Sequence, residues 1–140
     1  MSNLTDVFLM PFKVNTPKII DKLWGFEEVV VNNKQKNYCG KILNIKAGGV
    51  MSLHFHLRKD EVFYVISGNV HLVIVQNGEE KTFLLQPGNS FHIQQGLPHK
   101  LVGIEDARIA EFSTYDAEWD STRITKSTKY SNYDKDHAKK

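Results

Sequence analysis

The chain of 140 residues is 41% hydrophobic and 24% charged, which suits one globular domain large enough to bury a core. Its 18 basic and 16 acidic residues give a formal net charge of +2, and no run of basic residues interleaved with aromatic ones precedes the C-terminal segment. Nucleic-acid binding is therefore not expected.

The cysteine content and the N-terminal residues bear on the cellular compartment in which the protein is expected. Cys39 is the single cysteine, which excludes an internal disulfide, so we expect a buried thiol in a reducing, cytoplasmic environment. Pro11 interrupts the short apolar patch near the N-terminus, and no basic segment precedes that patch. Neither a signal peptide nor a membrane span is predicted.

The predicted elements are short strands. Residues 1–23 are expected to form an irregular N-terminal arm, and one domain is expected over residues 24–125. Strands at 26–31 and 38–45 flank a polar turn, and further strands are predicted around His54 and at 63–66, 70–76, 81–85, 90–93, 99–102 and 107–113. Asn77-Gly78 indicates a tight hairpin, and residues 126–140 are expected to form a polar tail.

No segment before Ser113 shows helical periodicity. About nine short strands separated by turns, in one small domain, predict an all-β fold, namely an antiparallel sandwich or jelly-roll barrel.

One stretch carries donors for a metal. His54 and His56 stand two apart, so on a strand their side chains point to the same face, and Glu61 opens the apolar run that follows. Imidazole nitrogens and a carboxylate oxygen are donors that divalent metals accept. Taken alone, the histidine pair is also consistent with a solvated or hydrogen-bonded pair.

The stretch from Gly48 to Gly68 fits, without a gap, the first motif of the cupin superfamily, G-x5-H-x-H-x(3,4)-E-x6-G. The chain therefore resembles cupins, in which these two histidines and the glutamate bind a metal inside a small β-barrel. The resemblance implies an antiparallel double-stranded β-helix with His54, His56 and Glu61 as ligands.

A second motif is expected later in the chain. Pro87-Gly88 and Gly96-x-Pro98-His99 resemble the second cupin motif, which implies His99 as the fourth ligand. The asparagine that often follows this histidine in the family is missing. On the same segment His92 is either a wall or surface residue, or a substrate contact.

Five short motifs narrow the resemblance to the type II mannose-6-phosphate isomerase branch. They are Trp24-Gly25-x-Glu27, Tyr38-Cys39-x-Lys41, the stretch Ser52 to Glu61, Glu111-Phe112-Ser113 and Asp120-x-x-Arg123, in the order of that family. His54 stands where the family has glutamine, and Lys59 where it has arginine. The resemblance implies a small carbohydrate substrate.

An aldose–ketose isomerase needs a base that carries a proton between two carbons. Glu111, Lys41 and His92 are the candidates, in that order. Because an unperturbed lysine has a pKa of about 10.4, Lys41 has the alternative role of orienting substrate oxygens.

Two more basic residues are candidate substrate contacts. Arg123 either binds a carboxylate or phosphate or pairs with a nearby acidic residue, for which Asp116, Glu118 and Asp120 are candidates. Lys59 either takes the place of the family's arginine or is a solvated charge.

Three functions stay open at this stage. The first is a metal-dependent isomerase or epimerase acting on a sugar or sugar-phosphate carbonyl, with Zn, Mn, Ni, Co or Fe bound. The second is a dioxygenase with Fe or Ni, and the third is a non-catalytic domain that binds or senses a small molecule. The resemblance also implies a homodimer.

Overall fold

The computed structural model describes residues 11–127. Its strands are β1 (Lys18–Lys22), β2 (Gly25–Asn33), β3 (Tyr38–Ile45), β4 (His54–His56), β5 (Glu61–Ser67), β6 (Val70–Gln76), β7 (Glu79–Leu85), β8 (Ser90–Ile93), β9 (His99–Gly103), β10 (Ala107–Ser113) and β11 (Ser121–Arg123). A 3-10 turn, Glu118–Asp120, precedes β11. Within the described part, no helix has the length and apolar character needed to cross a membrane.

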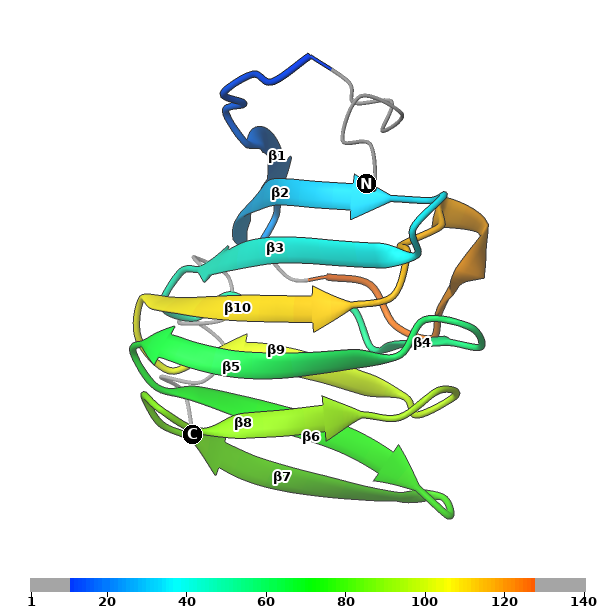
Figure 1. The fold of residues 1–140 in the computed structure, drawn as a ribbon. Coiled ribbons are helices and arrows are strands. Elements are labelled where there is room, and N and C mark those ends of the chain that lie inside the picture. The colour runs from blue at the N-terminus through cyan, green and yellow to red at the C-terminus, as the bar shows by residue number, and fades with distance from the viewer. Residues whose placement is uncertain (1–10, 128–140) are drawn as a thin grey trace.

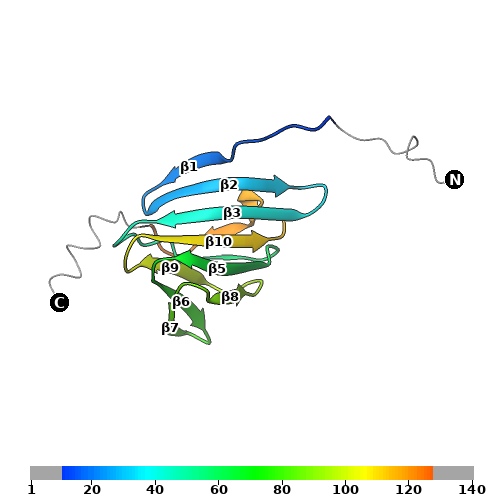
Figure 2. The same ribbon diagram turned by 60° about the vertical axis from the view of Figure 1, so that its left-hand side comes forward.

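The strands form two sheets that pack as layers (Figures 1 and 2). One has the order β1-β2-β3-β10-β5-β8 and the other β11-β4-β9-β6-β7, and the named pairs are antiparallel. This is the antiparallel jelly roll that the sequence predicts, so the all-β fold class is confirmed.

Two strands were not expected from the sequence. β1 lies inside the segment predicted to be an irregular arm, and it pairs with β2 along its whole length. The sequence Lys-Ile-Ile-Asp-Lys does not alternate between apolar and polar residues, and its stability comes from backbone pairing at the sheet edge. β11 has three residues, all exposed, and pairs with β4. Residues 1–10 and 128–140, which include most of the predicted tail, lie outside the described residues.

Two turns depend on special backbone conformations. Asn77 and Gly78 have φ values of 54° and 76°, as a two-residue hairpin between β6 and β7 requires. Gly68, the last residue of the first motif, has a φ of 76°, and a Cβ built there would lie 2.2 Å from the carbonyl oxygen of Asp106. Only glycine fits this position without a backbone shift.

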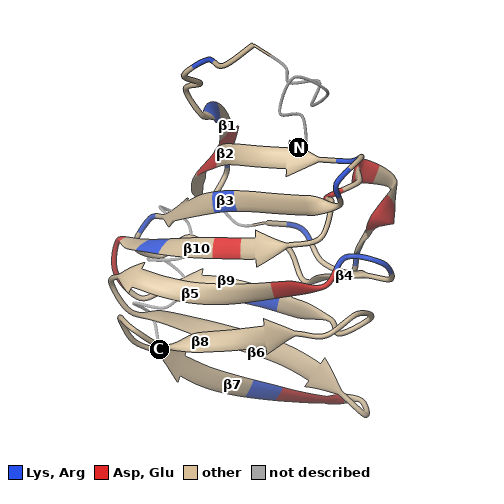
Figure 3. Ribbon diagram, in the orientation of Figure 1, with Lys and Arg blue, Asp and Glu red and all other residues tan. Residues whose placement is uncertain are grey.

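The inward faces of three neighbouring strands change from apolar to charged along the barrel. Leu43 on β3, Ile109 on β10 and Val65 on β5 are fully buried in the core. Two positions before Leu43 on β3 the inward residue is Lys41, and two positions after Ile109 on β10 it is Glu111. These two residues lie opposite each other in the register. Figure 3 shows these charged segments side by side, whereas β6 and β8 carry no charged residue. One end of the barrel is therefore apolar and the other is charged.

Candidate metal centre

Three histidines meet where β4 and β9 pair. His54 and His56 alternate along β4, and His54 lies directly opposite His99 on β9. One ring nitrogen from each histidine lies within 4.8 Å of the others. The ring centroids of His54 and His99 are 4.6 Å apart. The strand register thus places three imidazoles around one point.

Hydrogen bonds determine which nitrogen carries the proton on two of these rings. Nδ1 of His54 lies 2.8 Å from the carbonyl oxygen of Ser52, and Nδ1 of His99 lies 2.8 Å from that of Leu97. A carbonyl oxygen only accepts, so each Nδ1 donates, and Nε2 of the neutral ring keeps a free lone pair. Nδ1 of His56 is buried and has no hydrogen-bond partner among the described residues. These nitrogens fit a divalent metal.

Burial keeps two of the imidazoles in the form that binds metals. Burial, helped by the neighbouring His99, lowers the pKa of His54 from 6.5 to about 4. Burial, helped by the charge of Lys59, also lowers the pKa of His56. Both rings are therefore neutral near neutral pH, and a neutral imidazole is the metal-binding form.

Glu61 lies beside the histidines. Its Oε1 is 2.8 Å from Nε2 of His99, and both side chains are almost fully buried. When the proton of His99 is on Nδ1, a lone pair on Nε2 of His99 faces a lone pair on Oε1 of Glu61, and the two repel each other. A proton on Nε2, or a cation bound by both atoms, removes this repulsion. Two ligand atoms that bind one ion at about 2.1 Å and at right angles lie about 3 Å apart. The Glu61–His99 spacing fits such an ion.

A buried lysine connects Glu61 to two further carboxylates. Nζ of Lys59 lies 2.8 Å from Glu61, 2.9 Å from Glu111 and 3.6 Å from Asp116. Burial favours a neutral Lys59, but the charges of Glu111 and Glu61 outweigh it and raise the pKa of Lys59 well above its usual range. Burial raises the pKa of Glu111, which the Lys59 ammonium offsets only in part.

Lys41 extends this network toward the sheet edge. It pairs with Asp116 and, at 3.5 Å, with Glu27. Burial opposes the charge on Lys41, but Glu111 and Asp116 outweigh it and raise the pKa of Lys41. Lys41 therefore stays protonated.

Asp120 orders the loop that carries Lys59. Its buried carboxylate accepts hydrogen bonds from the backbone N–H groups of Leu57, Arg58 and Lys59 at 2.8–3.2 Å. A carboxylate that accepts several backbone N–H groups is held firmly. The turn before β11 thereby positions the loop between the second histidine and Glu61.

The charged end of the barrel encloses a pocket of about 840 Å³. This volume is in the range of small-molecule sites. The lining includes His54, His56, Glu61, Lys59, Glu111, Lys41, Asp116, Glu27, Lys18, Lys22 and Arg123. His99 is 1% exposed and lies behind this lining.

The profile of the Cupin family matches residues 24–132 of the chain. The chain belongs to the cupin family. This cupin matches no curated protein, but it is similar to solved structures. Oxalate decarboxylase of Bacillus subtilis is 19% identical over 82% of this chain, with a TM-score of 0.68. KdgF from a Halomonas species is 20% identical over 72% of this chain and 88% of its own, with a TM-score of 0.60.

At these identities the likeness shows the fold. The cupin spans about a third of the oxalate decarboxylase chain, of which 34% is covered. Bacillus subtilis oxalate decarboxylase has Mn(II) centres. The three histidines of this cupin are likewise able to bind a divalent metal, as expected from the sequence. The narrower likeness to type II mannose-6-phosphate isomerase stays a prediction.

The pocket brings together most of the residues singled out in the sequence. Lys59 is 4% exposed, so it is not the solvated charge of the alternative interpretation. Arg123 lies on β11 opposite His54 and has no ion pair with an acidic residue between residues 11 and 127. Since Lys41 is held protonated, it suits the role of orienting oxygens better than that of a base.

His92 does not reach the pocket. It lies on β8 between the inward-facing Phe91 and Ile93, and opposite Val62 of β5. Its exposed side chain pairs with Asp60 at 2.6 Å. Strand alternation turns it outward, which agrees with the surface interpretation and corrects its placement among substrate contacts.

Glu27 and Asp116 were not identified as site residues from the sequence. Glu27 comes from β2 and Asp116 from the segment after β10, and both meet at Lys41. The Trp24-Gly25-x-Glu27 motif contained the signal for Glu27. Asp116 lies in a polar stretch that offers no such pattern.

Proposed function

We propose that this cupin is a metal-dependent enzyme that acts on a small sugar or sugar-phosphate carbonyl as an isomerase or epimerase. The observation that carries the proposal is the position of Glu111, a buried carboxyl that lines the same pocket as His54 and His56. His54, His56, Glu61 and His99 are proposed to hold the metal.

A divalent metal, when bound, polarises a carbonyl oxygen and lowers the cost of removing a proton from the adjacent carbon. Glu111 is the group proposed to take and return that proton. Burial raises its pKa, which brings a carboxyl closer to the operating pH and makes it better suited to proton transfer. Lys59 lies 2.9 Å away and orients the carboxyl while it is ionised.

Lys41 is proposed to orient substrate oxygens from a position beside Glu111, its register partner on β10. It stays charged, and its ion pairs with Glu27 and Asp116 hold it in place. The core residue Phe63, which lies opposite Glu111 in the register, also lines the pocket and adds apolar surface to its wall.

The test combines metal content with proton exchange. Protein purified without chelator is analysed for its metals, and candidate aldoses and ketoses are incubated with it in heavy water. The proposal expects deuterium at the carbon next to the carbonyl. Glu111→Gln should slow this exchange by about 10²–10⁴-fold, the usual contribution of a general acid–base, while metal content stays unchanged. Glu80→Gln, on the exposed face of β7, is the matched control.

The other functions make different predictions for the same sample. Iron with oxygen uptake on a substrate would instead identify a dioxygenase. Bound metal with ligand-dependent stabilisation, but neither exchange nor oxygen uptake, would identify a binding domain. Unchanged metal content in His99→Ala would refute the four-ligand site. The homodimer stays a prediction, which light scattering on a sizing column tests.

A further inference from the structure

The pocket carries ten charged side chains that divide into two groups. The acidic ones are Glu27, Glu61, Glu111, Asp116 and Glu118, and the basic ones are Lys18, Lys22, Lys41, Lys59 and Arg123. Lys41 and Lys59 are engaged with four of the five carboxylates. Within residues 11–127, Lys18, Lys22 and Arg123 have no carboxylate within 4 Å.

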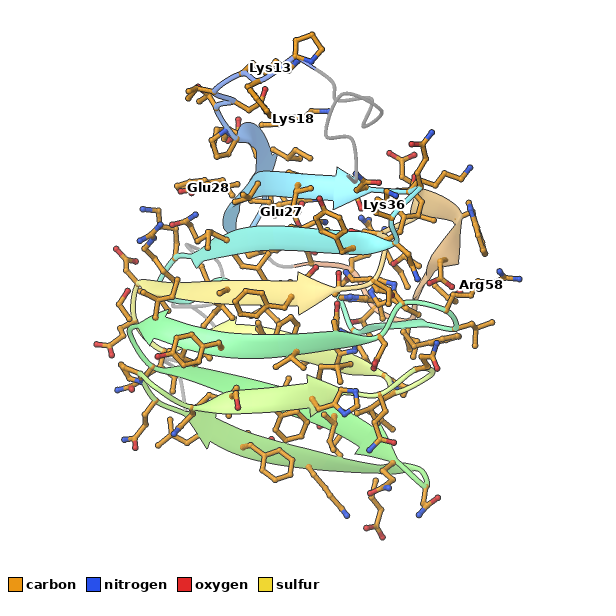
Figure 4. All side chains as sticks on the ribbon, in the orientation of Figure 1. Lys13, Lys18, Glu27, Glu28, Lys36 and Arg58 are labelled. Atoms are coloured by element: carbon orange, nitrogen blue, oxygen red, sulfur yellow. The ribbon has the colours of Figure 1, made fainter. Side chains whose placement is uncertain are left out.

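The three unpaired cations come from two strands that border the pocket. Lys18 and Lys22 are four residues apart on β1, the first strand of the six-stranded sheet, so both point to the pocket face together with Ile20. Figure 4 shows Lys18 on β1 and Glu27 on the neighbouring strand β2. Both β1 residues lie at the edge of the sheet, outside the Lys41 network.

Arg123 approaches from the other sheet. It lies on β11, the first strand of the five-stranded sheet, directly opposite His54 in the register. Residues opposite each other in an antiparallel pair point to the same face, so Arg123 shares the pocket face with His54. The pocket thus has basic side chains on two edge strands, and the histidine strand β4 is the inner neighbour of β11.

The charge along the pocket is therefore uneven. Around Lys41 and Lys59, four carboxylates face two ammonium groups, and a divalent metal at the histidines would balance this excess of negative charge. At the strand edges, Glu118 is the one acidic lining residue outside the network, against three cations. A ligand with an anionic end is attracted to the edge and repelled from the inner carboxylates.

We propose that Lys18, Lys22 and Arg123 form an anion-binding subsite, and that the substrate is an acidic sugar whose carboxylate or phosphate binds there. The inference rests on the proposed function, in which the other end of the sugar faces the histidines and Glu111. The guanidinium of Arg123 offers a planar fork of donors to an oxyanion, and the two lysines add point charges. A pocket of about 840 Å³ has room for a sugar and such a group.

The experiment measures the affinity of three probes for the purified protein by titration calorimetry. The probes are D-glucuronate, D-glucose 6-phosphate and D-glucose, which share a ring and differ in charge. The variants are Lys18→Gln with Lys22→Gln, and Arg123→Gln. The control is Lys34→Gln with Lys36→Gln, which removes as much charge as the double lysine variant, and more than Arg123→Gln, from exposed residues outside the pocket.

At least one charged probe should bind about tenfold more tightly than glucose, a difference that several charge contacts supply. Each pocket variant should lower that preference severalfold, leaving glucose affinity unchanged, and the control should keep the preference. Raised salt should weaken the charged probe more than glucose in the wild-type protein, a readout that needs no variant. Tighter binding of glucuronate identifies a carboxylate ligand, and tighter binding of the phosphate ester identifies a phosphate ligand.

Equal affinity for all three probes, no binding of either charged probe at millimolar concentration, or a preference that survives both pocket variants would overturn the subsite. These outcomes leave the metal content and proton exchange of the proposed function intact. Failure of the proposed function would be seen in a different measurement, because deuterium exchange would then not be slowed by Glu111→Gln.

Discussion

The low pKa of His54 predicts a measurable loss of stability in weak acid. In the metal-free protein His54 has a pKa of about 4, against 6.5 for the unperturbed group. Below about pH 6.5, His54 binds a proton in the unfolded chain but stays neutral in the folded protein until the pH approaches 4. The contribution of His54 to the free energy of unfolding is therefore greatest above pH 6.5 and falls as the pH drops toward 4. The difference between the two pKa values corresponds to about 3.4 kcal/mol once the pH is below both.

Between about pH 7 and pH 5 the same two pKa values give a loss of about 1.8 kcal/mol from this residue. The assay is urea unfolding, followed by tryptophan fluorescence, with a chelator present. Because carboxylates titrate nearby, the quantity to compare is the pH dependence of the wild-type protein minus that of His54→Gln. A difference close to zero would show that His54 is solvated in the folded protein and would refute the burial argument.

Four further predictions follow from buried or strained positions. Lys59→Met should lower the free energy of unfolding by about 3–5 kcal/mol, measured in urea, because it leaves buried carboxylates without their cation. Asp120→Ala should lower it by about 2–4 kcal/mol, since three backbone N–H groups lose their acceptor. Gly68→Ala should lower the thermal midpoint through a loss of about 1–3 kcal/mol, and an unchanged midpoint would contradict its positive φ. Burial, with the charge of Glu111, raises the pKa of the Cys39 thiol, so a disulfide reagent should modify it only after unfolding.

The sequence was sufficient for the parts of the site that depend on local spacing. His54 and His56 share a face because strand side chains alternate, and the glycine at position 68 marks a turn that only glycine fits. His99 followed from a resemblance, and the register with His54 explains why a histidine is useful there.

The contacts across the barrel could not be obtained in the same way. Asp116 meets Lys41 across 75 positions of sequence, and Asp120 caps a loop about 60 positions away. β1 is held by its backbone partner and not by its own pattern of residues. Such pairings depend on how the sheets close, and no local spacing in the sequence encodes them.

The pairing of His54 with His99 has a consequence for the unfolding of the protein. These residues lie opposite each other, although 45 positions (99 − 54) separate them along the chain. An ion bound by both would close a loop of that length, and the chain-entropy expression for cross-links gives about 4 kcal/mol for such a loop. The metal-loaded protein would then unfold at a higher urea concentration than the same protein after treatment with a chelator.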